Sequence, residues 1–186
     1  WSDNIAIYAK GESWAAPKNA VDLSSFDTGR TGDGFWFQGR MVESSGNIAA
    51  SVNNGFVYFH RGNVDNGGPL SFDAASFDLP EALGRDDTVS PGKEPILHFR
   101  DNEAFAAKEG LHVVKANPNQ GHDSHSIFDG FTAWSVKDGA HFEYTSHYTI
   151  RNFDLIAKEA TRFSKSDDGI SFGNNTSDMA VVNARI

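Results

Sequence analysis

Two histidines at equivalent places in two similar segments are the strongest candidates for chemistry in this sequence. His112 lies in GLHVVK (110–115) and His141 in GAHFEY (139–144). If these segments are neighbouring strands in register, the two imidazoles lie side by side on one face of a sheet. Imidazole titrates near neutral pH, so such a pair could take up and return protons during catalysis.

Other polar residues of the same segments complete a set that suits acidic sugars. Glu143 and Tyr144 follow His141, and the phenol of Tyr144 is a candidate acid or base. Uronate lyases and epimerases need a poised base and a cation that neutralises the carboxylate beside the proton removed. The predicted catalytic residues are His112, His141, Glu143 and Tyr144, and the predicted substrate-binding residues are Lys115, His60 and Trp36. The competing interpretation is a solvated face, because exposed histidines are common without function.

A glycoside hydrolase would need two carboxyl groups, about 5 Å apart for retention or roughly 6.5–9.5 Å for inversion. Glu143 is one candidate, and Asp129, Asp138 or Asp154 is the second. The spacing selects none of these pairs, so lyase and hydrolase chemistry both stay open.

Residues 122–125 contain the densest set of metal-ligand types. His122, Asp123 and His125 are candidate ligands for zinc or manganese, and His147 is expected to approach them from the next strand. A polar loop is the competing interpretation. Runs of Asp and Asn at 63–66, 86–87 and 167–168 offer oxygen ligands for calcium. No complete motif is present, so a divalent metal is the cofactor to test, calcium before zinc.

The histidine segments belong to a set of five in which a glycine precedes a short apolar strand. The position after the glycine is Phe35, Phe56, Leu111, Ala140 or Ile170, and two places later comes Phe37, Tyr58, Val113, Phe142 or Phe172. The position between them holds Trp36, Val57, His112, His141 or Ser171. The two apolar columns should face a core and the mixed column should face outward. Phe59 and Trp134 are expected in the core.

A second element lies before some of these strands. Asn47-Ile48-Ala49 and Asn102-Glu103-Ala104 each end six residues before their glycine, and related segments start at Asn4, Asn152 and Asn183. A corner asparagine can bond neighbouring backbone, so this column is predicted to be structural. Short strands, Gly and Asn corners and no amphipathic helix predict an all-β fold, a parallel β-helix, as one domain over 1–186. A long inserted loop is expected at about 61–95, where glycines and prolines cluster.

Composition limits the function classes. The 186 residues include no cysteine, so disulfides and thiolate chemistry are excluded. The formal net charge of −9 argues against a general nucleic-acid binder, and no apolar run reaches the roughly 20 residues of a membrane span. The last segment, 179–186, is strand-like without a polar cap, so further coils or a partner chain are expected at that end.

The order of these segments resembles a known family. GNIAA (46–50) with GFVYFH (55–60), FRDNEA (99–104) with GLHV (110–113), and FDGFTAW (128–134) with GAHF (139–142) are similar to the right-handed parallel β-helix of the cell-migration-inducing, hyaluronan-binding proteins that carry a G8 domain, which have bacterial secreted relatives. No catalytic residue is carried over. The resemblance implies a secreted, extracellular β-helix that binds or depolymerises an acidic polysaccharide. The alternative is a non-catalytic glycan-binding or structural module of a large secreted adhesin.

Overall fold

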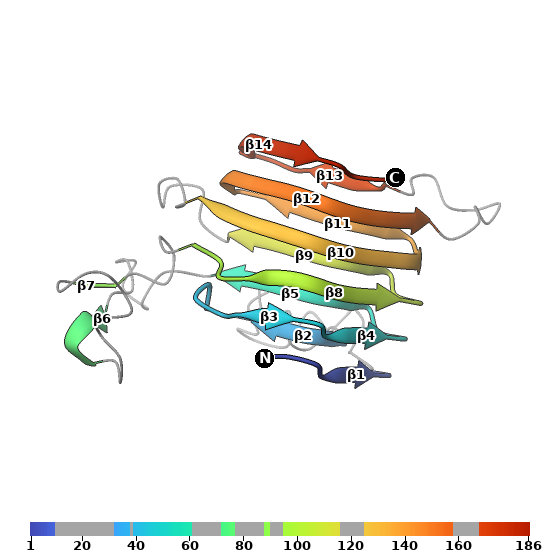
Figure 1. The fold of residues 1–186 in the computed structure, drawn as a ribbon, viewed down its shortest axis with the longest axis horizontal. Coiled ribbons are helices and arrows are strands. Elements are labelled where there is room, and N and C mark those ends of the chain that lie inside the picture. The colour runs from blue at the N-terminus through green and yellow to red at the C-terminus, as the bar shows by residue number, and fades with distance from the viewer. Residues whose placement is uncertain are drawn as a thin grey trace, which may run out of the picture.

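The structure is a computed structural model, and it describes residues 1–9, 32–37, 39–60, 72–76, 88–89, 95–115, 125–157 and 168–186. The described residues form an all-β fold built almost entirely from parallel strands (Figure 1). No α-helix lies in these ranges. No helix within them is long and apolar enough to cross a lipid bilayer.

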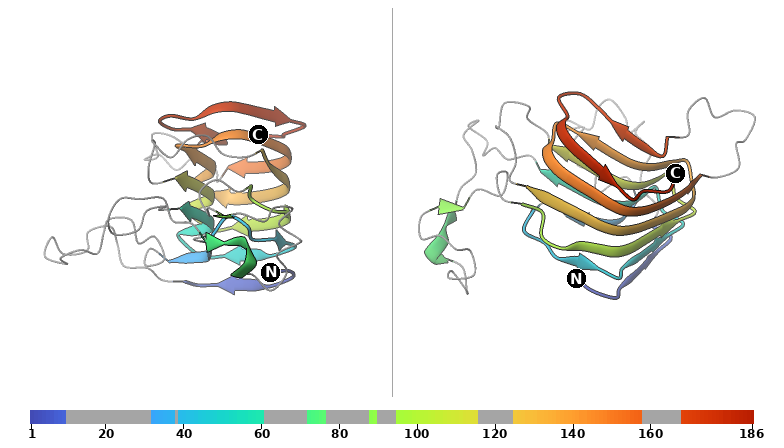
Figure 2. Two further views of the ribbon diagram at one scale, coloured as in Figure 1. Left: turned by 90° about the vertical axis from the view of Figure 1, so that its left-hand side faces the viewer. Right: turned by 45° about the horizontal axis from the view of Figure 1, so that its top comes forward.

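Two parallel sheets carry all but two of the described strands. The seven-stranded sheet contains β1 (Ile5–Ile7), β3 (Ser44–Ser45), β4 (Ile48–Ala50), β8 (Phe99–Phe105), β10 (Ser126–Val136), β12 (Ser146–Ala157) and β14 (Ser177–Val182). The five-stranded sheet contains β2 (Asp33–Phe37), β5 (Asn54–His60), β9 (Glu109–Lys115), β11 (Asp138–Glu143) and β13 (Ile170–Phe172). The chain visits the sheets alternately, and Figures 1 and 2 show the strands of each sheet stacked in chain order.

The five glycine-started segments are the five-stranded sheet, and their register agrees with the sequence alignment. Phe35 pairs with Phe56, Phe56 with Leu111, Leu111 with Ala140, and Ala140 with Ile170. Aromatic rings from the two sheets meet in the core, where the Phe56 ring centroid lies 5.5 Å from that of Phe99 and 6.0 Å from that of Phe131. The predicted inner column is therefore confirmed for its first four members, which are buried, while Ile170 is half-buried.

Three predictions about exposure are wrong. Val57 was expected to face outward into solvent, but it is only 1% exposed, because β5 is covered on its outer face as well as its inner face. Phe172 was expected in the core, but it is 46% exposed, because β13 is the edge strand of its sheet. Trp134 was also expected in the core. It is 39% exposed, because it follows the inward-facing Ala133 and points to the opposite face of β10. Phe59 is buried as predicted.

The glycines lie where a side chain would clash both with the next strand of the same sheet and with the other sheet. A Cβ added to Gly55 would lie 2.7 Å from the Cβ of Ala104 and 2.4 Å from the carbonyl oxygen of Gly110. A Cβ on Gly110 would lie 2.5 Å from the carbonyl oxygen of Gly139 and 3.1 Å from the Cβ of Ala133. The glycines of one sheet therefore pack against alanines of the other, which explains why both residue types recur together.

The asparagine column is structural for three of its members. The Oδ1 atom of Asn47 accepts hydrogen bonds from the backbone N and the Nδ2 of Asn4, both at 3.0 Å. The Oδ1 atom of Asn102 accepts from the backbone N of Asn47 at 3.0 Å and from its Nδ2 at 3.1 Å. Asn152 and Asn183 do not continue this column, because they pair in register with Gly130 rather than with Asn102.

Every level of the seven-stranded sheet bends at an equivalent residue. The residue there has a left-handed backbone in Asp3, Gly46, Asp101, Gly130, Asn152 and Asn183, with φ between 52° and 67°. Asp, Asn and Gly are the residue types that tolerate this conformation, so the bend is encoded locally. Figure 2 shows the resulting curvature of the long strands. Outward residues before the bend and after it thus belong to two separate surfaces.

The expected insertion at 61–95 is described only in part. β6 (Phe72–Asp73) and β7 (Thr88–Val89) pair antiparallel, and a short 3₁₀ helix η2 spans Ala74–Ser76. The rest of this loop, apart from residue 95, lies outside the described residues.

Candidate functional site

His112 and His141 lie side by side on the outer face of the five-stranded sheet, as predicted. They are register partners on β9 and β11, and their ring centroids are 5.1 Å apart. Each side chain is 26% exposed, so both rings are partly shielded and still reachable from solvent. The outer position follows from strand alternation, since the flanking residues Leu111 and Val113 are buried.

Glu109 holds the His112 ring, and sequence analysis missed this residue. Glu109 Oε2 lies 2.6 Å from His112 Nδ1, and its side chain is 14% exposed. An ionised carboxylate only accepts hydrogen bonds, so Nδ1 donates and the lone pair of neutral His112 is on Nε2. Residues three apart in a regular strand face opposite sides. Here Gly110 and Leu111 both face the core, so Glu109 and His112 both end up outside.

His141 has a different environment. Its Nδ1 lies 2.7 Å from Ser171 Oγ on the neighbouring strand, and its Nε2 lies 3.8 Å from Glu143 Oε2. Glu143 also accepts a hydrogen bond from Asn174 Nδ2 at 3.1 Å. The structure thus brings Glu143 to the histidine pair. Tyr144 lies just after β11, half-buried, with a left-handed backbone at φ 53°.

Of the three predicted substrate-binding residues, only Trp36 has a described side chain. His60 and Lys115 are register partners at the ends of β5 and β9, and their side chains lie outside the described ones. Trp36 occupies the same column as His112 but two strands away, and it is 37% exposed.

Of the predicted metal ligands, only His125 is described, and His122 and Asp123 lie outside the described residues. His125 Nε2 lies 2.8 Å from Thr149 Oγ1. His147 does approach His125, because both line one cavity, but His147 Nδ1 is paired with the carboxylate of Asp178. The described residues contain no group of three metal-ligating side chains.

The carboxyl pairs considered for a hydrolase do not form. Asp129 and Asp154 belong to the seven-stranded sheet, whereas Glu143 belongs to the five-stranded sheet. Asp138 is on the same strand as Glu143 but five residues earlier, which corresponds to about 16 Å of extended strand. That separation exceeds the roughly 9.5 Å limit for an inverting pair.

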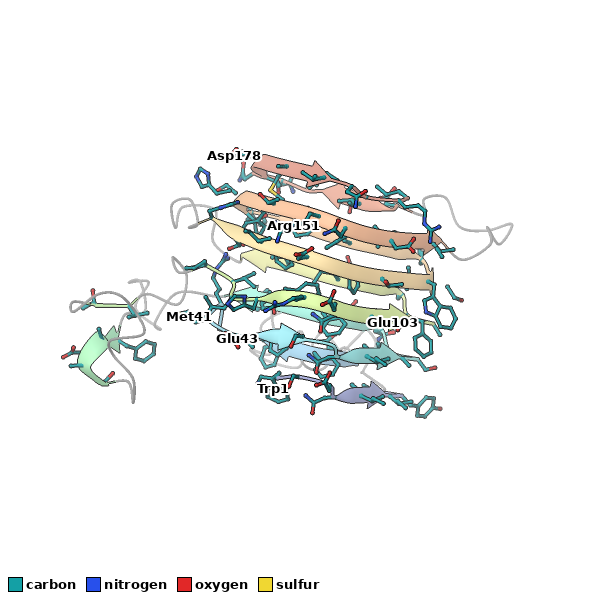
Figure 3. All side chains as sticks on the ribbon, in the orientation of Figure 1. Trp1, Met41, Glu43, Glu103, Arg151 and Asp178 are labelled. Atoms are coloured by element: carbon teal, nitrogen blue, oxygen red, sulfur yellow. The ribbon has the colours of Figure 1, made fainter. Side chains whose placement is uncertain are left out.

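A second candidate surface lies on the outer face of the seven-stranded sheet, before the bend. Two open cavities of about 410 Å³ each meet there at His125, which lines both. We call their combined surface the arginine groove. Figure 3 shows Arg151 and Asp178 on neighbouring levels of this surface. The groove is lined by Pro95, Ile96, Leu97, His98, Phe99, Arg100, His125, Ile127, Asp129, His147, Tyr148, Thr149, Arg151, Asp178 and Ala180.

The charges of the arginine groove come from neighbouring strands in register. Asp129 pairs with Arg100 on one side and with Arg151 on the other. Arg151 Nη2 donates to Asp129 Oδ2 at 2.8 Å, and Asn152 Nδ2 donates to Asp129 Oδ1 at 2.7 Å. The hydrogen bond from Arg151 lowers the pKa of Asp129, and Asn152 and the charge of Arg100 lower it further.

This lowered pKa gives a testable pH dependence. The ionised Asp129 stabilises the fold above the carboxyl's unfolded pKa, and this contribution is lost as the pH falls through its lower folded pKa. Asp129→Asn should therefore reduce the free energy of unfolding at neutral pH by a few tenths of a kcal/mol, since the pair is partly solvated. Thermal denaturation at neutral and acidic pH should show the two proteins converging in acid. A constant difference at both pH values would contradict this assignment.

Trp134 forms an exposed aromatic stack after the bend. Its ring lies 4.4 Å from the Phe105 ring, nearly parallel, and its Nε1 donates to Glu103 Oε1 at 2.6 Å. One face of the indole is covered by Phe105, which leaves less of the ring for a sugar than an isolated tryptophan would offer.

Comparison with known proteins gives no match: no family model, curated protein or solved structure resembles this chain at a significant level. Functional inference therefore depends on the residues of the two outer surfaces.

Proposed function

We propose that this chain is a right-handed parallel β-helix, secreted from the cell, that binds an acidic polysaccharide and depolymerises it at the histidine pair. Alternation of parallel strands between two sheets supports the helical path. The right-handed sense is expected because about 98% of crossovers between parallel strands have that hand. Outer faces of such stacks are long and ridged, which suits extended glycans.

The observation that carries the enzymatic proposal is the Glu109–His112 hydrogen bond beside His141. A carboxylate that orients a histidine through Nδ1 is a recurring way to prepare Nε2 as a general base. The adjacent ring of His141 lies 5.1 Å away, and its Nε2 is 3.8 Å from Glu143 Oε2, so a second proton-transfer group stands beside the first. The pair thus offers one group to accept a proton and another to donate one.

This arrangement fits β-elimination from a uronate better than hydrolysis. His112 Nε2 removes the proton on the carbon beside the carboxylate, and the bond from the next carbon to the glycosidic oxygen breaks. His141 or Tyr144 protonates the leaving oxygen, and the new chain end carries a carbon–carbon double bond. Lys115 and His60 are the candidates for neutralising the substrate carboxylate, as the sequence analysis predicts.

The test is turnover of a polyuronate, followed by the ultraviolet absorbance of the unsaturated product. His112→Ala should lower turnover by about 100-fold or more, because a positioned general base contributes roughly that much. Glu109→Gln should lower turnover and move the pH–rate profile, because an amide can no longer fix the histidine tautomer.

Asp154→Asn is the matched control for these variants, since Asp154 is half-buried on the other sheet and paired with Arg185. Its turnover should equal that of the parent chain. Equal turnover of His112→Ala and the parent chain would remove the catalytic assignment.

A second candidate function is binding without cleavage, as a module of a large secreted adhesin. Both cavities of the arginine groove lie on the other sheet from the histidine pair, which favours this candidate. Exposed apolar side chains on the last level, including Val182 and Ile186, suit stacking of further coils or a partner chain. Glycan binding with no product formed would select this candidate.

A further inference from the structure

The arginine groove crosses four neighbouring strands on the face opposite the histidine pair. It receives Arg100 from β8, Ile127 from β10, Thr149 from β12 and Ala180 from β14. Adjacent strands are about 4.8 Å apart, so the groove extends about 14 Å across the sheet, the reach of a short oligosaccharide. The inner faces of the two sheets pack on one core, so their outer faces point away from each other.

Arg100 acts on Asp129 through its charge, but no ion pair joins the two side chains in the part of the chain that the structure describes. Arg151 is paired with Asp129, and His147 with Asp178. Among the described residues, Arg100 forms no ion pair, and its Nη2 lies 3.4 Å from His98 Nδ1. The side chain of Arg100 is exposed beside the cavity, so its guanidinium is available to an anion.

The surroundings of Arg100 combine apolar surface with polar groups. Ile127 is exposed one strand away, and Leu97 is half-buried at the same cavity, so the C–H face of a sugar ring has apolar contacts. The exposed His125 and its neighbour Thr149 add polar groups, whereas His98 already has Arg100 at Nδ1 and Glu43 Oε1 3.7 Å from Nε2. A cation, an apolar strip and several polar groups are what a short anionic sugar requires.

We infer that the arginine groove is a second glycan site, which binds a carboxylated or sulfated oligosaccharide with one anionic group on Arg100. The site is distinct from the histidine pair. The inference rests on the proposed acidic-polysaccharide ligand but not on catalysis at His112. A chain held in this groove would stay attached to the protein while other parts of the same polymer reach the opposite face.

The test is calorimetric titration of the full chain with three probes of matched length: an oligogalacturonate, a sulfated galactan oligosaccharide and a neutral malto-oligosaccharide. The two anionic probes report the carboxylate and the sulfate separately. Binding of at least one of them is expected, with the neutral probe bound at least tenfold more weakly, because a charge-assisted hydrogen bond to Arg100 would be absent.

Variants move this binding in opposite directions. Arg100→Ala should weaken binding of the anionic probe about tenfold or more. Asp129→Asn should strengthen it severalfold, because the substitution removes a negative charge and releases Arg151. Arg185→Ala, an exposed arginine on the same sheet outside the groove, should leave binding unchanged.

These outcomes separate the groove from the proposed activity. His112→Ala should keep full binding of the anionic probe, so loss of turnover with retained binding supports two sites. Arg100→Ala binding as tightly as the parent chain, or the neutral probe binding equally well, would overturn the inference. An equal loss of affinity in Arg100→Ala and Arg185→Ala would also overturn it, because the probe would then respond to the overall charge of the protein rather than to Arg100. Titrating the Arg100, Asp129 and Arg185 variants in the His112→Ala background prevents turnover of the probe, so the outcome does not depend on whether the histidine pair is catalytic.

Discussion

Gly55→Ala is expected to destabilise the fold by about 3 kcal/mol or more, the upper part of the range for overpacking a core. The new Cβ would lie 2.4 Å from the Gly110 carbonyl oxygen and 2.7 Å from the Ala104 Cβ. Neither neighbour can move alone, because both belong to hydrogen-bonded strands of opposite sheets. Urea denaturation followed by circular dichroism would measure the loss.

Gly39→Ala is the matched control, because no heavy atom of the described residues lies within 4 Å of the Cβ it would add. Its free energy of unfolding should stay within about 0.5 kcal/mol of the parent value. The double variant Gly55→Ala with Ala104→Gly removes one of the two clashes and should recover part of the loss. If Gly55→Ala is as stable as Gly39→Ala, the close approach of the sheets is wrong.

Asn102→Ala should have an effect of similar size, about 3–5 kcal/mol, because several buried polar groups lose their partners at once. Asn102 is 1% exposed, accepts from the backbone and side chain of Asn47, and donates through Nδ2 to the Ser44 carbonyl at 2.8 Å. Alanine satisfies none of these groups and leaves space where the amide was. Thermal denaturation would report the change.

Asn174→Ala provides the comparison for Asn102→Ala. Asn174 is exposed and donates one hydrogen bond to Glu143, so its loss should cost less than about 1 kcal/mol. Similar melting temperatures for the two variants would show that the buried asparagine column contributes little to stability.

The sequence predicted the register of the five-stranded sheet well and the solvent exposure of its outer residues poorly. The glycines and the alternating residues after them aligned Phe35, Phe56, Leu111 and Ala140 correctly, because a glycine forced by close packing recurs at the same place on each level. Exposure is a property of neighbours rather than of the pattern. Val57 is therefore covered and Phe172 exposed, although alternation placed both on the expected sides.

The candidate site was predicted in part for the same reason. The repeat brought His112 beside His141 but gave no indication of Glu109, because regular alternation would place residues 109 and 112 on opposite faces. The signal was present in Gly110, whose missing side chain allows two successive residues to face the core. The arginine groove had no sequence signal, since Arg100, Asp129 and Arg151 meet only because β8, β10 and β12 pair in that register.

The close contact between glycine and alanine columns also determines where this architecture can acquire new specificities. Between the described strands, Phe56, Phe99 and Phe131 fill the space from one sheet to the other, so these strands do not enclose a compartment for cargo. Outward residues, by contrast, can be exchanged without disturbing that packing. New ligand preferences would therefore evolve through substitution of outward-facing residues, while the packed core stays the same.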